Sequence, residues 1–229
     1  EAIAVLNAGL ADCLHLMTAF QEGETLFGDA LTQLGWDARD TCTGALACKL
    51  RTQRATFLVY LGQLEDAQAD LSHCLAVFED LKEIEEVAHC RFYLGESARF
   101  LGRMERAKAL YTESLQGYRQ TCNRSAVGFC LNGLGTICAA MDAASEARLY
   151  LEESRAMFQA LGHVMGEAIA TINLADLLIG LEEFAAAAER LDRGHRLCRE
   201  IGHRWGMATC RQHAGDIARV TGRWEDARA

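Results

Sequence analysis

The sequence has no proline among its 229 residues. Proline interrupts helix interiors and recurs in the turns of β-rich domains, so its absence removes the strongest helix breaker. Half of the residues are hydrophobic and 24% are charged. This composition favours long helices, and we expect an all-α fold.

The sequence also has no run of lysine or arginine, and its formal net charge is −9. A surface that binds nucleic acid normally carries a basic stripe. No Gly-x-x-x-x-Gly-Lys-Ser/Thr motif is present to bind nucleotide phosphates. We therefore expect neither direct contact with nucleic acid nor ATP binding by this chain.

Long hydrophobic runs and paired cysteines are missing as well. The apolar stretch 168–181 is interrupted by Asn173 and Asp176, whereas a membrane span needs about 20 apolar residues in a row. The ten cysteines stand singly, without a Cys-x-x-Cys pair or a signal peptide, which is typical of reduced, buried thiols. We expect a cytoplasmic chain without a membrane segment. Because it begins without methionine and ends within a predicted helix, we expect it to be part of a longer protein.

What is present is an internal repeat with a period of 40 residues. The block GQLEDA at 62–67 recurs as GRMERA at 102–107, DAASEA at 142–147, EEFAAA at 182–187 and GRWEDA at 222–227. Small side chains let two antiparallel helices approach closely, so each repeat is predicted to be a helical hairpin. The small residues expected at the crossings stand seven positions before each block: Ala55, Gly95, Gly135, Ala175 and Gly215.

The second helix of each hairpin is expected to present an alanine, then a large residue, then a small one on the same face, as in Ala147, Leu151 and Ser154. The turns between the two helices suit a left-handed glycine at Gly62 and Gly102, and Asp142 and Glu182 replace it either at the cost of local strain or with a different loop. We predict one repeat domain over 1–229, with hairpins at about 2–38, 44–81, 84–121, 124–161 and 164–201 and a truncated sixth at 204–229.

These residues resemble the tetratricopeptide repeat, whose signature is small residues at the helix crossing and an alanine that opens the second helix. The period is longer than the usual one of about 34 residues. The 40-residue spacing, with NLAD at 173–176 and QEGETLFGDAL at 21–31, is similar to the C-terminal sensor region of bacterial STAND signal-transduction ATPases. Adaptor proteins that orient the mitotic spindle share the long repeat. The resemblance implies a right-handed superhelical solenoid of hairpins, with about five complete hairpins and the first helices lining a concave groove.

The register predicts which side chains face this groove, because they lie one turn on either side of the crossing residue. A strip of Thr56, Glu96, Thr136, Asp176 and Asp216, one residue per repeat, suits a ligand with amide or cationic groups. The alternative is that the carboxylates are merely solvated and that apolar residues such as Phe92 and Phe129 pack on the next hairpin. The predicted groove residues are His89, Phe92, Glu96, Arg99, Phe129, Asn132, Thr136, Ile172, Asp176, Gln212, Asp216 and Arg219.

Catalytic and metal sites are not expected. The pairs His195–Cys198 and Cys210–His213 have helical spacing, but they fall on different helices, and Cys210 stands in line with Cys90 and Cys130 as a packing residue. No Ser-His-Asp set is singled out by the repeats. Trp205 and Trp224 are interpreted as staples at hairpin junctions.

The resemblance implies a non-catalytic binding module that recognises a peptide, a protein segment or a small inducer in its groove. We expect it to be the sensor part of a larger signalling or transcription-regulating protein. The alternative is a passive scaffold for protein partners. No cofactor is expected, and a dimer through the terminal hairpin is possible because the truncated end would leave apolar faces around Ile217 and Val220 uncovered.

Overall fold

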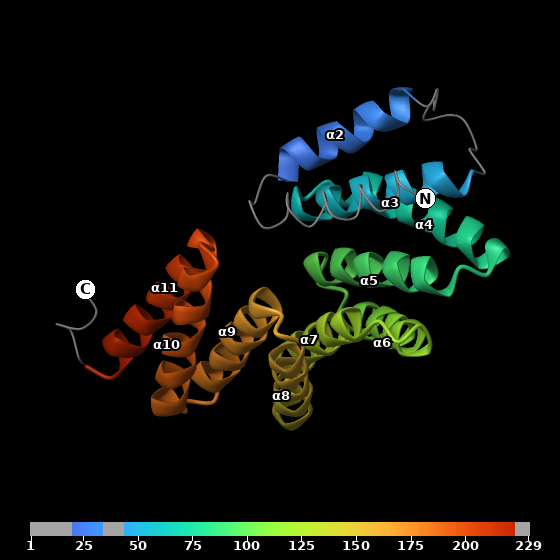
Figure 1. The fold of residues 1–229 in the computed structure, drawn as a ribbon. Coiled ribbons are helices and arrows are strands. Elements are labelled where there is room, and N and C mark those ends of the chain that lie inside the picture. The colour runs from blue at the N-terminus through green and yellow to red at the C-terminus, as the bar shows by residue number, and fades with distance from the viewer. Residues whose placement is uncertain (1–19, 34–43, 223–229) are drawn as a thin grey trace. The chain divides into compact units, whose positions relative to one another are not determined.

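The structure is a computed structural model that describes residues 20–33 and 44–222. These residues form helices without a strand, so the predicted all-α class is confirmed (Figure 1). The helices are α2 (Phe20–Gln33), α3 (Ala45–Tyr60), α4 (Leu64–Leu81), α5 (Ile84–Phe100), α6 (Met104–Gln120), α7 (Arg124–Ala140), α8 (Ala144–Leu161), α9 (Val164–Gly180), α10 (Phe184–Glu200) and α11 (Arg204–Val220).

The described residues divide between Cys122 and Asn123 into two compact units. Unit 1 contains α2 to α6, and unit 2 contains α7 to α11. Each helix packs on the next within its unit, and α5, α7, α9 and α11 begin 40 residues apart. Each unit is therefore a repeat solenoid of helical hairpins, as the sequence predicted.

Within each unit, the first helices of consecutive hairpins lie closer together than the second helices. Cα atoms of α7 and α9, of α9 and α11, and of α3 and α5 approach within 8 Å, whereas α8 and α10, or α4 and α6, do not come this close in the described chain. A stack bends toward the side with the tighter spacing. We call the side of α7, α9 and α11 the inner face of unit 2.

Small residues lie at the helix crossings as predicted. A Cβ atom at Gly135 would lie 2.6 Å from Cγ of Leu151 and 3.3 Å from the carbonyl oxygen of Ala147, which leaves no room for a side chain. Ala147 and Leu151 are fully buried. The pattern that defined the repeat is thus a packing pattern, because the second helix occupies the space that a larger residue would need.

The second helix of each hairpin carries another small residue seven positions after its alanine, and in three hairpins this residue forms a hydrogen bond. The hydroxyl of Ser154 donates to the carbonyl oxygen of Gly128 at 2.8 Å, and Ser114 donates to Ala88 at 2.7 Å. The thiol of Cys74 donates to Cys48 at 3.4 Å. Gly194 occupies this position in α10 and has no side chain to donate.

The turns within hairpins contain a left-handed residue at the predicted positions. Gly62 and Gly102 have φ of 77° and 72°, and Asp142 and Glu182 have φ of 59° and 60°. The backbone N–H of Ala143 donates to Cys138 and that of Asp142 donates to Ala139, the pair of bonds that closes a Schellman motif. The two non-glycine residues therefore adopt a conformation that glycine tolerates better.

Some expectations concern residues outside the described ranges. These are most of the hairpin predicted at 2–38, and Trp224 with the end of the sixth hairpin. At the end of α11, Val220 is 64% exposed, but Ile217, which was expected to be uncovered, is 3% exposed and belongs to the core of unit 2. Dimerisation through this end stays a prediction.

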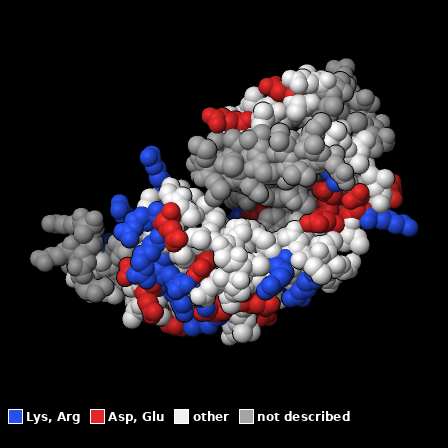
Figure 2. Space-filling model, in the orientation of Figure 1, with Lys and Arg blue, Asp and Glu red and all other residues white. Residues whose placement is uncertain are grey.

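The surface shows no concentration of one charge on the face in view. Figure 2 shows basic and acidic side chains interspersed over α10 and α11. Within the described ranges, no helix combines the length and the apolar character that crossing a membrane requires.

Candidate binding groove

The inner face of unit 2 contains a pocket of about 290 Å³ between α9 and α11. It includes the predicted groove residues Ile172 and Asp176, and Thr209 one repeat further along. The complete lining is Ala168, Ile169, Ile172, Asn173, Asp176, Cys198, His203, Trp205, Gly206, Thr209 and His213.

Two polar pairs lie along this inner face. The amide of Asn173 donates to Oδ1 of Asn132 on α7 at 3.0 Å. Oδ1 of Asp176 lies 3.9 Å from Nδ1 of His213 on α11. The side chain of Asp176 is 67% exposed, so it keeps accessible acceptor oxygens for a ligand.

Apolar and aromatic side chains complete the pocket. Ile172 is 7% exposed and belongs to the core as well as to the pocket lining. Trp205 is 66% exposed and lines the pocket. Trp205, interpreted from the sequence as a staple at a hairpin junction, therefore lies largely in solvent, and its ring makes an edge contact with His203 at 6.1 Å.

A pair of thiols lies at the inner end of the pocket. Cys198 and Cys210 are 1% and 2% exposed. A hydrogen bond from Cys210 lowers the pKa of Cys198, burial opposes this effect, and His203 adds to the lowering. The same hydrogen bond and burial raise the pKa of Cys210. Cys198 is thus the thiol that loses its proton first.

His203 is held in place by its position before α11. Its Nδ1 accepts a hydrogen bond from the backbone N–H of Gly206 at 3.1 Å, which caps the helix. A Cβ at Gly206 would lie 2.5 Å from the Cys198 sulfur and 2.6 Å from Nδ1 of His203. The missing side chain at Gly206 is what allows these groups to meet beside the pocket.

The other groove residues predicted in unit 2 lie outside the pocket. Thr136 donates to the carbonyl of Gly133 in its own helix at 2.8 Å. The ring of Phe129 is half-buried against Phe158, with centroids 4.8 Å apart. Gln212, Asp216 and Arg219 lie on α11, where Arg219 pairs with Asp216 at 2.9 Å.

The residues predicted on α5 of unit 1 contact one another and tyrosines of α5 and α6. Glu96 is 7% exposed, accepts from the hydroxyl of Tyr111 at 2.5 Å and accepts from Arg99 at 2.6 Å. Burial and the negative charge of Glu96 raise the pKa of Tyr111. A ligand of Glu96 would have to displace one of these partners. The half-buried ring of Phe92 lies 5.5 Å from Tyr111, and that of His89 lies 4.9 Å from Tyr93.

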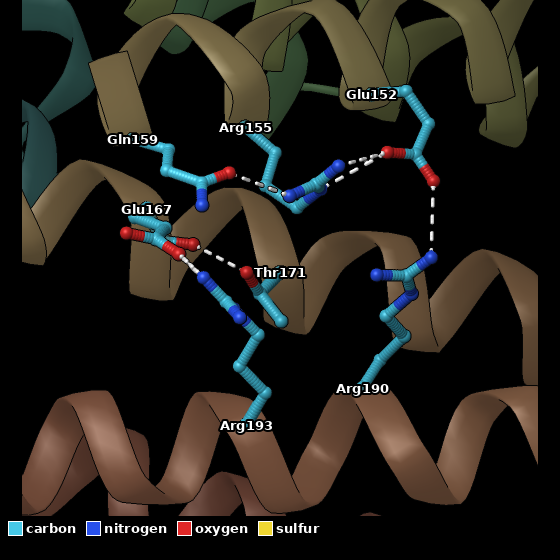
Figure 3. Close-up of polar contacts among 7 residues, drawn as sticks. All are labelled: Glu152, Arg155, Gln159, Glu167, Thr171, Arg190 and Arg193. Atoms are coloured by element: carbon cyan, nitrogen blue, oxygen red, sulfur yellow. Dashed lines mark hydrogen bonds and ion pairs between the residues drawn. The ribbon is translucent and has the colours of Figure 1, made fainter. Parts of the chain in front are cut away.

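Several buried ion pairs were not predicted. Arg51 and Arg54 both donate to Asp70, each at 2.7 Å, and Asp70 is 5% exposed. Figure 3 shows a second set that links three helices of unit 2. Arg193 of α10 binds Glu167 of α9, with Nε at 3.0 Å from Oε1.

The other contacts drawn in Figure 3 are those of Glu152 on α8, a bond from Arg155 to Gln159 at 3.2 Å and a bond from Thr171 to the carbonyl oxygen of Glu167 at 2.6 Å. Arg155 donates to Oε2 of Glu152 at 2.8 Å within α8, and Arg190 of α10 approaches Oε1 of Glu152 at 3.4 Å. Of these contacts, that of Arg190 joins α8 to α10. In the described part of the chain, no three His, Cys, Asp or Glu side chains come together as metal ligands.

Comparison with known proteins identifies the repeat. A sequence model of the family described as tetratricopeptide repeat matches residues 45–120 and 86–160, which together span just over half of the chain. Comparison of the sequence with curated proteins gives no significant match.

Several solved structures are similar. BtubC from P. vanneervenii has 20% identity and a TM-score of 0.64, with 88% of this chain and 82% of that chain covered. A Pyrococcus horikoshii STAND protein with a tetratricopeptide repeat sensor has 16% identity and a TM-score of 0.66, with 95% and 35% covered. A Rap protein complexed with Competence and Sporulation Factor has 13% identity and a TM-score of 0.75, with 95% and 70% covered. At these identities the likeness concerns the fold.

Proposed function

The chain belongs to the tetratricopeptide repeat family, a family of protein-binding modules, and on that basis we propose that the inner face of unit 2 binds an extended peptide or protein segment. The pocket between α9 and α11 is the observation that carries this proposal. It joins an apolar end, at Ile172 and Cys198, to polar groups at the half-buried Asn173 and the exposed Asp176. Ligand sites commonly combine such an apolar wall with a few polar groups that fix orientation.

The amide side chains suit a peptide in particular. Asn132 and Asn173 each carry a donor and an acceptor, as a peptide bond does. An extended backbone that crosses α7 and α9 would exchange the bond between the two amides for bonds to its own N–H and C=O groups. Asp176 would attract a cationic or hydrogen-bond-donating group beside this backbone. The other predicted groove residues of unit 2 are proposed to extend this surface, and those of unit 1 to form a contact surface of their own.

A selection from random dodecapeptides displayed on phage tests the proposal. Wild-type protein is expected to enrich a related set of sequences that bind the double variant Asn173→Ala/Asp176→Ala at least about ten-fold more weakly. Asp192→Ala is the matched control, because it removes an exposed carboxylate of α10 that does not line the pocket. Peptides that bind wild type and the double variant equally well would contradict the inner face as the site.

A small inducer is a second candidate occupant, favoured by the size of the pocket. Its volume of about 290 Å³ lies near the lower end of small-molecule sites. Native mass spectrometry of protein purified from its own cells would show a bound mass that is lost on denaturation and absent from an Asp176→Ala/Asp216→Ala variant. Absence of any bound mass would favour a scaffold for protein partners.

We further propose that this module is the cytoplasmic sensor of a larger signalling or transcription-regulating protein. The similar STAND protein carries a tetratricopeptide repeat sensor, and the similar Rap protein was solved with Competence and Sporulation Factor bound. The gene tests this directly. A nucleotide-binding ATPase motif in the same reading frame supports the sensor, and a gene that encodes only further repeats contradicts it in favour of a passive scaffold.

A further inference from the structure

The pocket of unit 2 lies where the other hairpins place an aromatic ring. At the period of 40 residues, Cys198 of α10 corresponds to Phe78 of α4, Tyr118 of α6 and Phe158 of α8. These three aromatic residues are 0%, 5% and 0% exposed. In the hairpin of α9 and α10, one buried ring is thus replaced by a single sulfur atom.

The surroundings of Phe158 show which space that ring fills. Its centroid lies 4.8 Å from the ring of Phe129 on α7 and 5.2 Å from that of His163 before α9. A Cβ at Gly166 would lie 2.4 Å from the Phe158 ring. One period later the corresponding residues all line the pocket; they are Ile169, His203 and Gly206.

The place that the Phe158 ring fills in the preceding hairpin is only partly filled in the next one. Beside Gly206 lie the Cys198 sulfur and Nδ1 of His203, 2.5 Å and 2.6 Å from the position of a Cβ, and the remaining space is the pocket. Elsewhere, a cavity of about 150 Å³ is enough to bind benzene, and this pocket measures about 290 Å³. Asp176 on the rim offers an acceptor to a polar group carried by the ring.

We propose that this pocket binds an aromatic ring that carries a hydrogen-bond donor, supplied by a tyrosine or tryptophan side chain of the bound peptide in place of the missing internal ring. The inference rests on the proposed function and names the anchor residue of the ligand. The ring fills the space between Ile169, Cys198 and Gly206, and its hydroxyl or N–H donates to Asp176. Trp205, exposed beside the pocket, covers the inserted ring from the side of α11 and reports its arrival through fluorescence.

The first test uses p-cresol, which has the ring and hydroxyl of tyrosine, and cyclohexylmethanol as a non-aromatic control of similar size. Binding is followed by Trp205 fluorescence, in a background without the other two tryptophans, and by amide shifts in α9 and α11. Cys198→Phe restores the internal ring and is expected to weaken p-cresol binding at least about ten-fold. Asp192→Ala is the matched control: it removes an exposed carboxylate of α10 outside the pocket and should keep binding within about two-fold.

Equal binding of the two alcohols to wild type, or equal p-cresol binding to wild type and Cys198→Phe, would overturn the assignment of a ring site. If Cys198→Phe does not fold, Thr209→Phe narrows the same pocket from its exposed side and carries the same expectation. Retained helix content by circular dichroism shows that each variant is folded.

A second measurement separates a peptide side chain from a free small molecule. A pentapeptide of alanines with a central tyrosine is compared with p-cresol and with the same peptide carrying leucine. The tyrosine peptide should bind at least about ten-fold more tightly than either, and Asn173→Ala should remove its advantage over p-cresol. Tighter binding by p-cresol would overturn the peptide source and assign the site to a free phenol. Selected dodecapeptides that lack aromatic residues would refute the ring anchor while leaving the proposed peptide groove intact.

Discussion

At the scale of single residues, two helical glycines differ in their surroundings: one lies at a packed helix crossing and the other does not. Gly135 faces Leu151 with no space for a Cβ, whereas nothing lies within 4 Å of the corresponding atom at Gly180. Gly135→Ala should therefore destabilise the protein by about 1 to 3 kcal/mol through overpacking. Gly180→Ala, at the end of α9, should be neutral or stabilise by up to about 1 kcal/mol because alanine restricts the unfolded chain. Urea unfolding of both variants measures the difference, and equal midpoints would show that the crossing is not at Gly135.

The two thiols of unit 2 predict how the reactivity of Cys198 depends on pH. The hydrogen bond from Cys210 lowers the pKa of Cys198 to about 6, with burial opposing it and His203 assisting. Since the thiolate is the reactive form, the alkylation rate of Cys198 by iodoacetamide should reach half its maximum near pH 6 rather than near the ordinary thiol pKa of about 8.5. Mass spectrometry of the labelled peptide measures this rate. In Cys210→Ala the half-maximum should move upward, and a half-maximum near pH 8.5 in the wild type would contradict the hydrogen bond.

The same shift predicts how stability depends on pH. Between about pH 6 and pH 8.5 the folded protein has lost the Cys198 proton while the unfolded chain still binds it. The contribution of this group to stability therefore rises with pH in this window and is lost as pH falls through 6. Thermal unfolding of wild type and Cys198→Ala should diverge toward the upper end of the window, and parallel curves would argue against a native thiolate.

At the scale of elements, the turns within hairpins show where the repeat carries strain. Asp142 and Glu182 hold φ near 60°, where Gly62 and Gly102 stand in other hairpins. Glu182→Gly should stabilise the protein by about 1 kcal/mol, and Asp142→Gly by less, because aspartate tolerates the left-handed region better than glutamate. Glu183→Gly is the control, since Glu183 already has a φ of −81° and pairs with Arg148, so glycine there should bring no gain in stability. Loss of stability in Glu182→Gly would mean that its side chain stabilises the turn.

The link between α9 and α10 can be tested through Glu167 and Arg193. Glu167 is 7% exposed and Arg193 is its ion-pair partner. Arg193→Met should lower the free energy of unfolding by about 2 kcal/mol, because it leaves the carboxylate of Glu167 desolvated and without its partner. The loss is smaller than for a fully buried pair because water still reaches the side of Arg193. The double variant Glu167→Met/Arg193→Met should be more stable than Arg193→Met alone. The reverse order in urea unfolding would show that the pair itself contributes most of the stability.

The repeat made the elements predictable, while the candidate site was only partly predictable. Small residues at a fixed spacing report directly on helix crossings, so the hairpins and the turn positions of Asp142 and Glu182 could be read from the sequence. Asp176 and Ile172 followed from the same register. The pocket was not predicted, although the sequence contains a signal for it. The position held by Phe78, Tyr118 and Phe158 at the 40-residue period is held by Cys198 in the next repeat. The ion pairs of Asp70 and Glu167 depend on the reach of long arginine side chains, which spacing along one helix does not specify.

At the scale of the whole molecule, a repeat stack should respond locally to a local defect. Within each unit, each hairpin packs on the next in sequence, and stability in such arrays is approximately a sum of repeat and nearest-neighbour terms. The division between Cys122 and Asn123 places α3 and α4 in unit 1 and the Gly135 crossing in unit 2. Gly135→Ala should therefore accelerate amide hydrogen exchange at least about five-fold in α7 and α8 through sub-global opening, and leave α3 and α4 unchanged. Mass spectrometry of exchanged peptides measures both regions in one sample. Equal acceleration in the two units would mean that all hairpins open together. The chain would then unfold as one cooperative body, and a ligand bound at α9 and α11 would also stabilise α3 against opening.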